Sequence, residues 1–228
     1  WDSELGNLVL RQQGVENGLT EYLSNGQRSR AMNGQGALKK RSAWGELASY
    51  VLVGFDHIVP KGLDHILFVL GLFFLTLRVS ALLWQISAFT LAHTVTLAAG
   101  AMGWVTISGS IVEPLIAASI VFVAVENIFS QKLHRWRAAL IFGFGLLHGL
   151  GFASVLQEFG LPDGQFIAAL IGFNIGVEIG QITVIACAFL LLGVWFGNKP
   201  WYRAYISIPF SCLIALIGAY WVIERTIL

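Results

Sequence analysis

Apolar stretches of about the length that crosses a lipid bilayer follow one another from Trp44 almost to the end of this 228-residue chain. A helix needs about 20 apolar residues to cross the hydrocarbon core, because each residue adds about 1.5 Å. We expect spans at 63–77, 80–102, 110–129, 136–157, 165–196 and 203–223, and a partial or interfacial helix at 44–58. The sequence therefore predicts an all-α membrane protein, a polytopic helical bundle of six spans plus one partial helix, or of seven spans if 44–58 crosses. Because 165–196 exceeds one straight crossing, we expect it to tilt, kink or protrude.

The composition favours the same class of protein. Hydrophobic residues make up 56% of the chain and charged residues 12%, whereas about 25% of the residues of a soluble chain are charged. The 14 basic and 13 acidic residues nearly cancel, so no basic face indicates nucleic acid as a partner. Cys187 and Cys212 each lie alone in an apolar run, and we interpret both as packing residues.

Residues 1–42 differ from the rest of the chain, being polar and rich in Gly, Asn and Gln. Two short apolar stretches, LVL and EYL, are separated by turn residues and favour strands or pieces of a hairpin. The segment is too small to bury a core by itself. We therefore expect 1–42 to be an extracytoplasmic polar tail or the remnant of a truncated N-terminal domain, and 43–228 to be a transmembrane helical domain.

The loops predict an orientation. Arg78, the QKLHRWR loop at 131–137, and Lys199 with Arg203 follow the first, third and fifth predicted spans, whereas the loop at 103–109 is neutral. Loops rich in Lys and Arg stay in the cytoplasm. We expect these basic residues to be cytoplasmic and to serve topology only, which places the N-terminal tail outside.

Ionisable and amide side chains recur within the spans, where each costs a few kcal/mol in contact with lipid. Counted at about 1.5 Å per residue, those at 64–65, 93, 148, 174 and 178 fall at similar depths in the outer half of four helices. The candidate metal ligands are Asp64, His65, His93, His148 and Glu178. Candidates for an outer collecting site or for support of the ligands are Asp56, His57, Asn174 and Glu113. The candidates for an inner path are Glu126, Asn127 and Gln181.

Imidazole and carboxylate form a nitrogen and oxygen ligand set that suits nickel, cobalt, zinc or iron, and the lack of sulfur disfavours copper(I). Thr90 and Thr94 flank His93 and are candidates for orienting its ring. Glycines recur every four residues beside the polar positions, at 172, 176 and 180 and at 145 and 149. Such spacing lets membrane helices approach closely, so we expect tight packing around the site.

Five stretches resemble the HupE/UreJ family of bacterial membrane proteins, in the branch with an extracytoplasmic N-terminal region. They are HIVPKGLDHILFVLGL (57–72), FTLAHTVTLA (89–98), VEPLIAASIVFVAVENI (112–128), LLHGLGFA (146–153) and NIGVEIGQ (174–181). The resemblance implies a bacterial inner membrane protein that acts as a nickel or cobalt permease or as an accessory to metalloenzymes. It also implies that His57, Asp64 and His65 are site residues, although six residues separate His57 from Asp64 where nickel/cobalt permeases have four.

Three functions remain open on these residues. The first is a divalent-metal permease or metal-delivery protein, with nickel favoured and cobalt or zinc chemically acceptable, and with the lipid bilayer, the metal ion and metalloenzyme maturation proteins as partners. The second is an intramembrane zinc-dependent hydrolase, in which one carboxylate acts as a general base. The third is an accessory subunit of a larger membrane complex. Under the first, we expect His65 to be a ligand and His57 to lie nearer water, with a smaller effect on binding.

Overall fold

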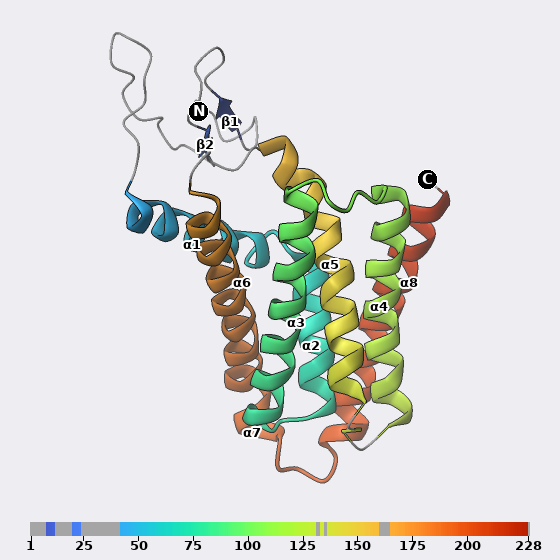
Figure 1. Ribbon diagram of the computed structural model, residues 1–228. Helices are drawn as coiled ribbons and strands as arrows, with labels where there is room; N and C mark the ends of the chain where they lie inside the picture. Colours follow the sequence, from blue (N-terminus) through green and yellow to red (C-terminus); the bar gives the residue numbers. More distant parts are fainter. Residues whose placement is uncertain are drawn as a thin grey trace, which may run out of the picture.

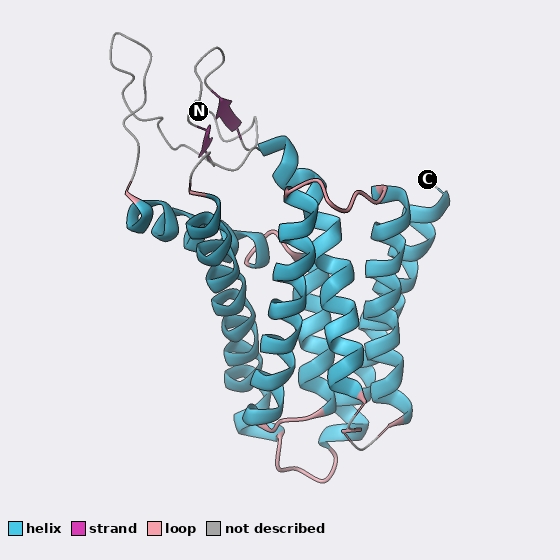
Figure 2. Ribbon diagram, in the orientation of Figure 1, coloured by secondary structure: helices cyan, strands magenta, loops and turns pink. Residues whose placement is uncertain are grey.

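The computed structural model describes residues 8–11, 20–23, 42–130, 133–134, 136–159 and 165–227, without the side chains of the two strands and of 153–159. Helices predominate (Figure 2). The elements are β1 Leu8–Arg11, β2 Thr20–Leu23, α1 Ala43–Ile58, α2 Leu63–Leu75, α3 Val79–Ala101, α4 Gly109–Phe129, α5 Arg137–Phe159, α6 Phe166–Ala188, η2 Phe189–Gly193, α7 Val194–Phe196, η3 Arg203–Ser207 and α8 Ile208–Ile227. The two strands pair in antiparallel fashion, which confirms the strands expected at LVL and EYL.

Most of the predicted helices are present with nearly the predicted bounds. The spans expected at 80–102, 110–129 and 136–157 correspond to α3, α4 and α5. Among the described residues, α3, α4, Phe166–Phe196 and Arg203–Ile227 are long and apolar enough to cross a membrane, and Arg137–Phe152 is a shorter apolar stretch. The long stretch at 165–196 contains the π-helical turn η2 near its end, a local widening of the helix that shifts the faces of its last turns.

The structure corrects the interpretation of 44–58 and 63–77 as a partial helix beside a full span. Helix α2 has 13 residues and is about 20 Å long, too short for a hydrocarbon core of about 30 Å. Helices α1 and α2 are long and apolar enough to cross a membrane only when taken together, as a pair bent by 73°. Pro60 and Gly62 lie in the turn between them, where the missing proline N–H breaks no helical hydrogen bond. The described residues thus give four to five candidate spans, and the count of six stays a prediction.

Helix α2 lies at the centre of the bundle (Figure 1). It contacts α1, α3, α4, α6 and α8, and its side chains Phe68, Leu72 and Phe73 are fully buried. A helix surrounded by other helices needs apolar residues on all its faces, which explains why 66–75 reads as one unbroken apolar run. The position of α2 gives its first turn access to neighbours on every side.

Glycines determine how closely the outer helices approach. A side chain at Gly172, Gly176 or Gly180 of α6 would collide with Leu47, Val51 or Ile58 of α1, respectively. On the other side, a side chain at Gly145 or Gly149 of α5 would collide with Phe89 or His93 of α3. The prediction that these two glycine series permit tight packing is confirmed. The pairs α1–α6 and α3–α5 therefore hold their backbones against each other around the site.

Large apolar side chains also cover the outside of the bundle. Trp84, Leu91, Leu190 and Leu216 are all more than 60% exposed. Apolar surface of this extent is unfavourable in water but is the surface that lipid requires. The chain is therefore a multi-pass membrane protein whose partner is the lipid bilayer.

The connections fall at two opposite ends of the bundle (Figure 1). The α2–α3 loop with Arg78, the described residues 133–134 between α4 and α5, and the α7–η3 turn with Lys199 lie at one end. The loop at 102–108 and the end of α8 lie at the other. The basic loops thus share one end, and their assignment to the cytoplasm stays a prediction.

Candidate metal site

The bend between α1 and α2 brings two histidines together. His57 is in the last turn of α1, and His65 is in the first turn of α2. Their ring centroids are 4.9 Å apart, in an edge-to-face arrangement. A straight helix would place His57 and His65 about two turns apart, whereas the bend brings their rings into contact.

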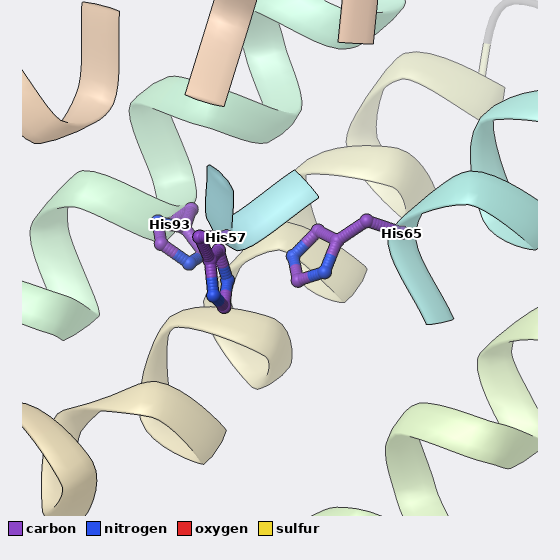
Figure 3. Close-up of side chains that lie close together, drawn as sticks. All are labelled: His57, His65 and His93. Atoms are coloured by element: carbon purple, nitrogen blue, oxygen red, sulfur yellow. The ribbon is translucent and has the colours of Figure 1, made fainter. Parts of the chain in front are cut away.

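His93 of α3 completes a group of three imidazoles (Figure 3). One ring nitrogen from each of His57, His65 and His93 lies within 4.8 Å of the others. His65 is 6% exposed and His93 is fully buried, whereas His57 is partly buried. Figure 3 shows the three side chains converging from separate segments of the chain.

Each member of this three-histidine group has a ring nitrogen without a partner. The Nε2 atoms of His57, His65 and His93 are buried and make no hydrogen bond. Leaving a buried polar atom unpaired costs about 1–3 kcal/mol, and most such atoms in proteins are satisfied. Three imidazoles with ring nitrogens this close together, and with an unpaired Nε2 on each ring, form an arrangement that a transition-metal ion would satisfy.

Asn174 of α6 fixes the protonation of the His93 ring. Its Oδ1 lies 3.3 Å from Nδ1 of His93, and its Nδ2 donates to the carbonyl of Leu170 at 2.8 Å. An amide oxygen only accepts, so Nδ1 of His93 carries the proton and Nε2 keeps the lone pair that a metal needs. The threonines expected to orient this ring bond elsewhere, since Thr90 donates to Gln181 and Thr94 to the carbonyl of Thr90.

His148 of α5 borders the group on the side of His65. It is 1% exposed, and its ring centroid lies 4.8 Å from that of His65. The hydroxyl of Ser119 donates to the carbonyl of Ile116 at 2.6 Å, so its oxygen accepts from Nε2 of His148 at 3.2 Å. Nδ1 of His148 then keeps its lone pair, and this atom is buried without a partner. Ser119 thus has the same effect on His148 that Asn174 has on His93.

Phenylalanines enclose the imidazoles. The ring of Phe152 lies 4.2 Å from that of His57, and the ring of Phe89 lies 5.0 Å from that of His148. Phe173 contributes a third ring, 5.4 Å from His57. An apolar shell lowers the local dielectric constant and strengthens the hold of a ligand set on a cation.

The acidic residues expected as ligands have other partners in this structure. Asp64 forms an ion pair with Arg225 at 2.8 Å, and Glu178 accepts a hydrogen bond from Ser87 at 2.6 Å. Asp56 pairs with Lys61 at 3.6 Å, where both side chains are more than 40% exposed. Within the described part of the chain, the group with metal-binding geometry therefore contains histidines alone.

The residues expected on an inner path are also bonded to other groups of the protein. Asn127 donates to the carbonyl of Gly71 at 2.7 Å and to Ser211 at 3.2 Å. Glu126 accepts from Arg137. Arg137 corrects the prediction that the basic residues of 131–137 serve topology only, because it is 1% exposed and also donates to Gln85 at 3.0 Å.

A cavity of about 380 Å³ lies beside three of the imidazoles, and its lining includes Arg225 of the last turn of α8. Histidines 57, 65 and 148 line it together with Lys61, Gly62, Leu63, Asp64, Glu113, Ile116, Gly151, Phe152, Trp221 and Arg225. Sequence reasoning missed Arg225 and Ser119. A charged residue near the end of the last apolar run was a usable signal for Arg225, whereas a lone serine in an apolar helix gives none.

Fold and site together define a multi-pass helical membrane protein with a buried cluster of imidazoles from several helices. The family model described as HupE / UreJ protein matches residues 33–225. The chain therefore belongs to the HupE/UreJ family, as the motifs around His57, His93 and His148 indicated. No curated protein and no solved structure matches the chain.

Proposed function

We propose that this chain is a bacterial inner-membrane protein that binds a divalent transition-metal ion and moves or delivers it as a permease. The observation that carries the proposal is the group of three imidazoles with ring nitrogens within 4.8 Å of one another, together with a buried and unpaired Nε2 on each ring. Burying these nitrogens without hydrogen bonds lowers the stability of the fold, so a purely structural role does not explain them. A bound cation would pair with these nitrogens and remove that cost.

The ligand set that we propose is His57, His65 and His93, with His148 as a fourth imidazole beside them. It departs from the set expected from the sequence by including His57 and leaving Asp64 and Glu178 bonded to other residues. Neutral imidazoles suit nickel, cobalt and zinc, and the family resemblance makes nickel our first choice. The cavity that reaches His57, His65 and His148 gives the ion a route from the extracytoplasmic side.

Transport requires the ion to continue past the imidazoles toward the basic end. On that route Glu126 is bonded to Arg137, and both residues are almost completely buried. We propose that this structure is the outward-facing form, in which the Glu126–Arg137 ion pair closes the inner half. Release of the ion inward then requires this pair to separate.

The hydrolase alternative needs a carboxylate beside the metal to act as a base. Asp64 and Glu178, the two carboxylates expected to serve, are held by Arg225 and Ser87. This arrangement favours binding and transfer of the ion over catalysis. A delivery role within a larger complex uses the same site, and co-purification of a stoichiometric partner would support it.

Metal binding by the purified protein tests the proposal directly. We expect Ni²⁺ titration calorimetry and elemental analysis to show stoichiometric binding that His93→Ala abolishes. His134→Ala is the matched control, because His134 is exposed in the α4–α5 connection and stacks on Trp136. If His93→Ala binds Ni²⁺ as the parent does, the proposed site is wrong. Uptake of Ni²⁺ into proteoliposomes then separates a permease from a delivery protein.

A further inference from the structure

A charged residue outside the imidazole group stands at the mouth of the cavity. Arg225 is in the last turn of α8, and its two terminal nitrogens donate to the two carboxylate oxygens of Asp64 at 2.8 and 3.1 Å. This is the forked geometry in which a guanidinium binds a carboxylate most strongly. Both side chains line the cavity that contains His65 and His148.

The fork neutralises a carboxylate that is next to one of the imidazoles in the sequence. Asp64 precedes His65 directly, and the side chains of Asp64 and Arg225 are 24% and 21% exposed. An ion that enters the cavity therefore meets a carboxylate already occupied by a positive charge. Removing that positive charge would strengthen the attraction of Asp64 for a divalent cation.

Arg225 also has partners that it can keep when it leaves Asp64. One terminal nitrogen lies 3.3 Å from the carbonyl oxygen of Glu113, and the guanidinium lies 5.1 Å from the centre of the Trp221 ring. A cation over a tryptophan face is a favourable contact. The guanidinium can thus release the carboxylate without losing all its interactions.

We propose that Arg225 is a positioning residue that occupies the Asp64 carboxylate until an entering divalent cation displaces it. One cation replaces another on the carboxylate: the guanidinium leaves Asp64 and keeps its contacts with the Glu113 carbonyl and Trp221, and Asp64 turns to the metal beside His65. This inference rests on the proposed function and adds to it the order in which the ion meets its ligands. It also gives Asp64 a role in the loaded state.

A purely structural role makes the opposite prediction. If Arg225 only ties α8 to α2 and α4, its removal loosens the turn that carries His65 and weakens metal binding. If Arg225 competes with the metal, removing its charge tightens binding, because Asp64 is then free. The sign of the change in affinity therefore separates the two roles.

Cobalt titration monitored by visible absorption measures this sign. We expect Arg225→Gln to tighten Co²⁺ binding by about tenfold, because the Asp64 carboxylate is then free to attract the ion. In an Asp64→Asn background the same substitution should change the affinity by less than about threefold, since coupled residues are not additive. Arg203→Gln is the control, because Arg203 donates to the carbonyl of Ile128 at the opposite end of the bundle and should leave binding unchanged. Weaker binding in Arg225→Gln overturns the inference.

A second measurement uses the fluorescence of Trp221 in protein that retains Arg225. Zn²⁺ is the ion to use, because its filled d shell does not quench tryptophan by d–d absorption. Displacement of the guanidinium from Asp64 should then change the emission of Trp221. We expect a Zn²⁺-dependent change in the parent that is lost in both Trp221→Phe and Asp64→Asn. An undiminished change in Trp221→Phe overturns the displacement.

The same series distinguishes the two levels of the proposal. If the parent binds no Co²⁺, or if His93→Ala binds it unchanged, the proposed function fails and this inference fails with it. If the parent binds Co²⁺ through His93 and Arg225→Gln binds it more weakly, the inference alone is overturned.

Discussion

His57 and His65 lie on the two helices of the bent pair α1–α2, with their ring centroids 4.9 Å apart. The bend of 73° between α1 and α2 gives the two residues equal access to His93. The nearest nitrogens of the three rings all lie within 4.8 Å of one another. In the adjacent pairs Asp56-His57 and Asp64-His65, the two histidines therefore belong to one group, whereas the two aspartates have different partners, Lys61 and Arg225.

This relationship predicts that His57 and His65 contribute alike to metal binding. We expect His57→Ala and His65→Ala each to weaken Ni²⁺ binding by about 100-fold or more, because each removes one nitrogen from a buried set. Titration calorimetry in detergent measures both, with Asp56→Asn as the control at an exposed ion pair. A loss of less than about threefold in His57→Ala would return that residue to the outer, supporting role expected from the sequence.

Asn174 should affect the metal without touching it. Its carbonyl oxygen holds the proton of His93 on Nδ1, so Asn174→Leu should weaken Ni²⁺ binding by about 10- to 100-fold, as for other residues that orient a ligand. Asn174→Asp also accepts from Nδ1 and should bind more tightly than the leucine variant. Equal affinities in the two variants would show that the hydrogen bond has no part in binding.

The buried ion pair between Arg137 and Glu126 should matter for stability. Arg137→Gln leaves Glu126 without its charge partner in the bundle, and such a change costs about 3–5 kcal/mol. Unfolding in mixed micelles measures the loss, which should be smaller when both residues are replaced together by Met and Leu. Ni²⁺ affinity of the folded fraction should stay within about threefold of the parent, and a larger change would connect this pair with the imidazoles.

Gly176 offers a test of the α1–α6 contact. A methyl group at this position would collide with the backbone around Val51 and Gly54 of α1, so Gly176→Ala should shift α1 and with it His57. We expect lower stability and at least tenfold weaker Ni²⁺ binding, since close packing leaves no room for the added atom. Gly143→Ala in α5 is the matched control, because nothing lies within 4 Å of the added atom. Parent-like binding by Gly176→Ala would show that α1 can move without disturbing the site.

The orientation in the membrane is open to labelling. In a background where Cys187 and Cys212 are replaced by serine, we expect Ser108→Cys to react with an impermeant reagent from outside the cell. Lys199→Cys should react only from the cytoplasmic side, because basic loops are retained there. The reverse pattern of reactivity would show that the protein has the opposite orientation, with the cavity mouth facing the cytoplasm.

The sequence by itself determined the helices and their approximate ends. In lipid each segment has to satisfy its own backbone hydrogen bonds, so an apolar run of sufficient length forms a helix whatever its neighbours are. This is why α3 and α4 begin and end near the predicted residues. The glycine series at 172–180 also had a local signal, since only small residues permit close helix contacts.

Only the tertiary structure decided which polar groups meet. Side chains of consecutive helical residues point in directions about 100° apart, so Asp64 turns to Arg225 while His65 turns to His93. No local pattern distinguishes the two, because the rotation of α2 is set by the helices packed around it. The contact of His57 with His65 likewise depends on the bend between α1 and α2. We attribute the angle of this bend to the packing of α1 on α6. The residue types of the site were therefore readable from the sequence, whereas its ligand set depended on packing between segments far apart in the chain.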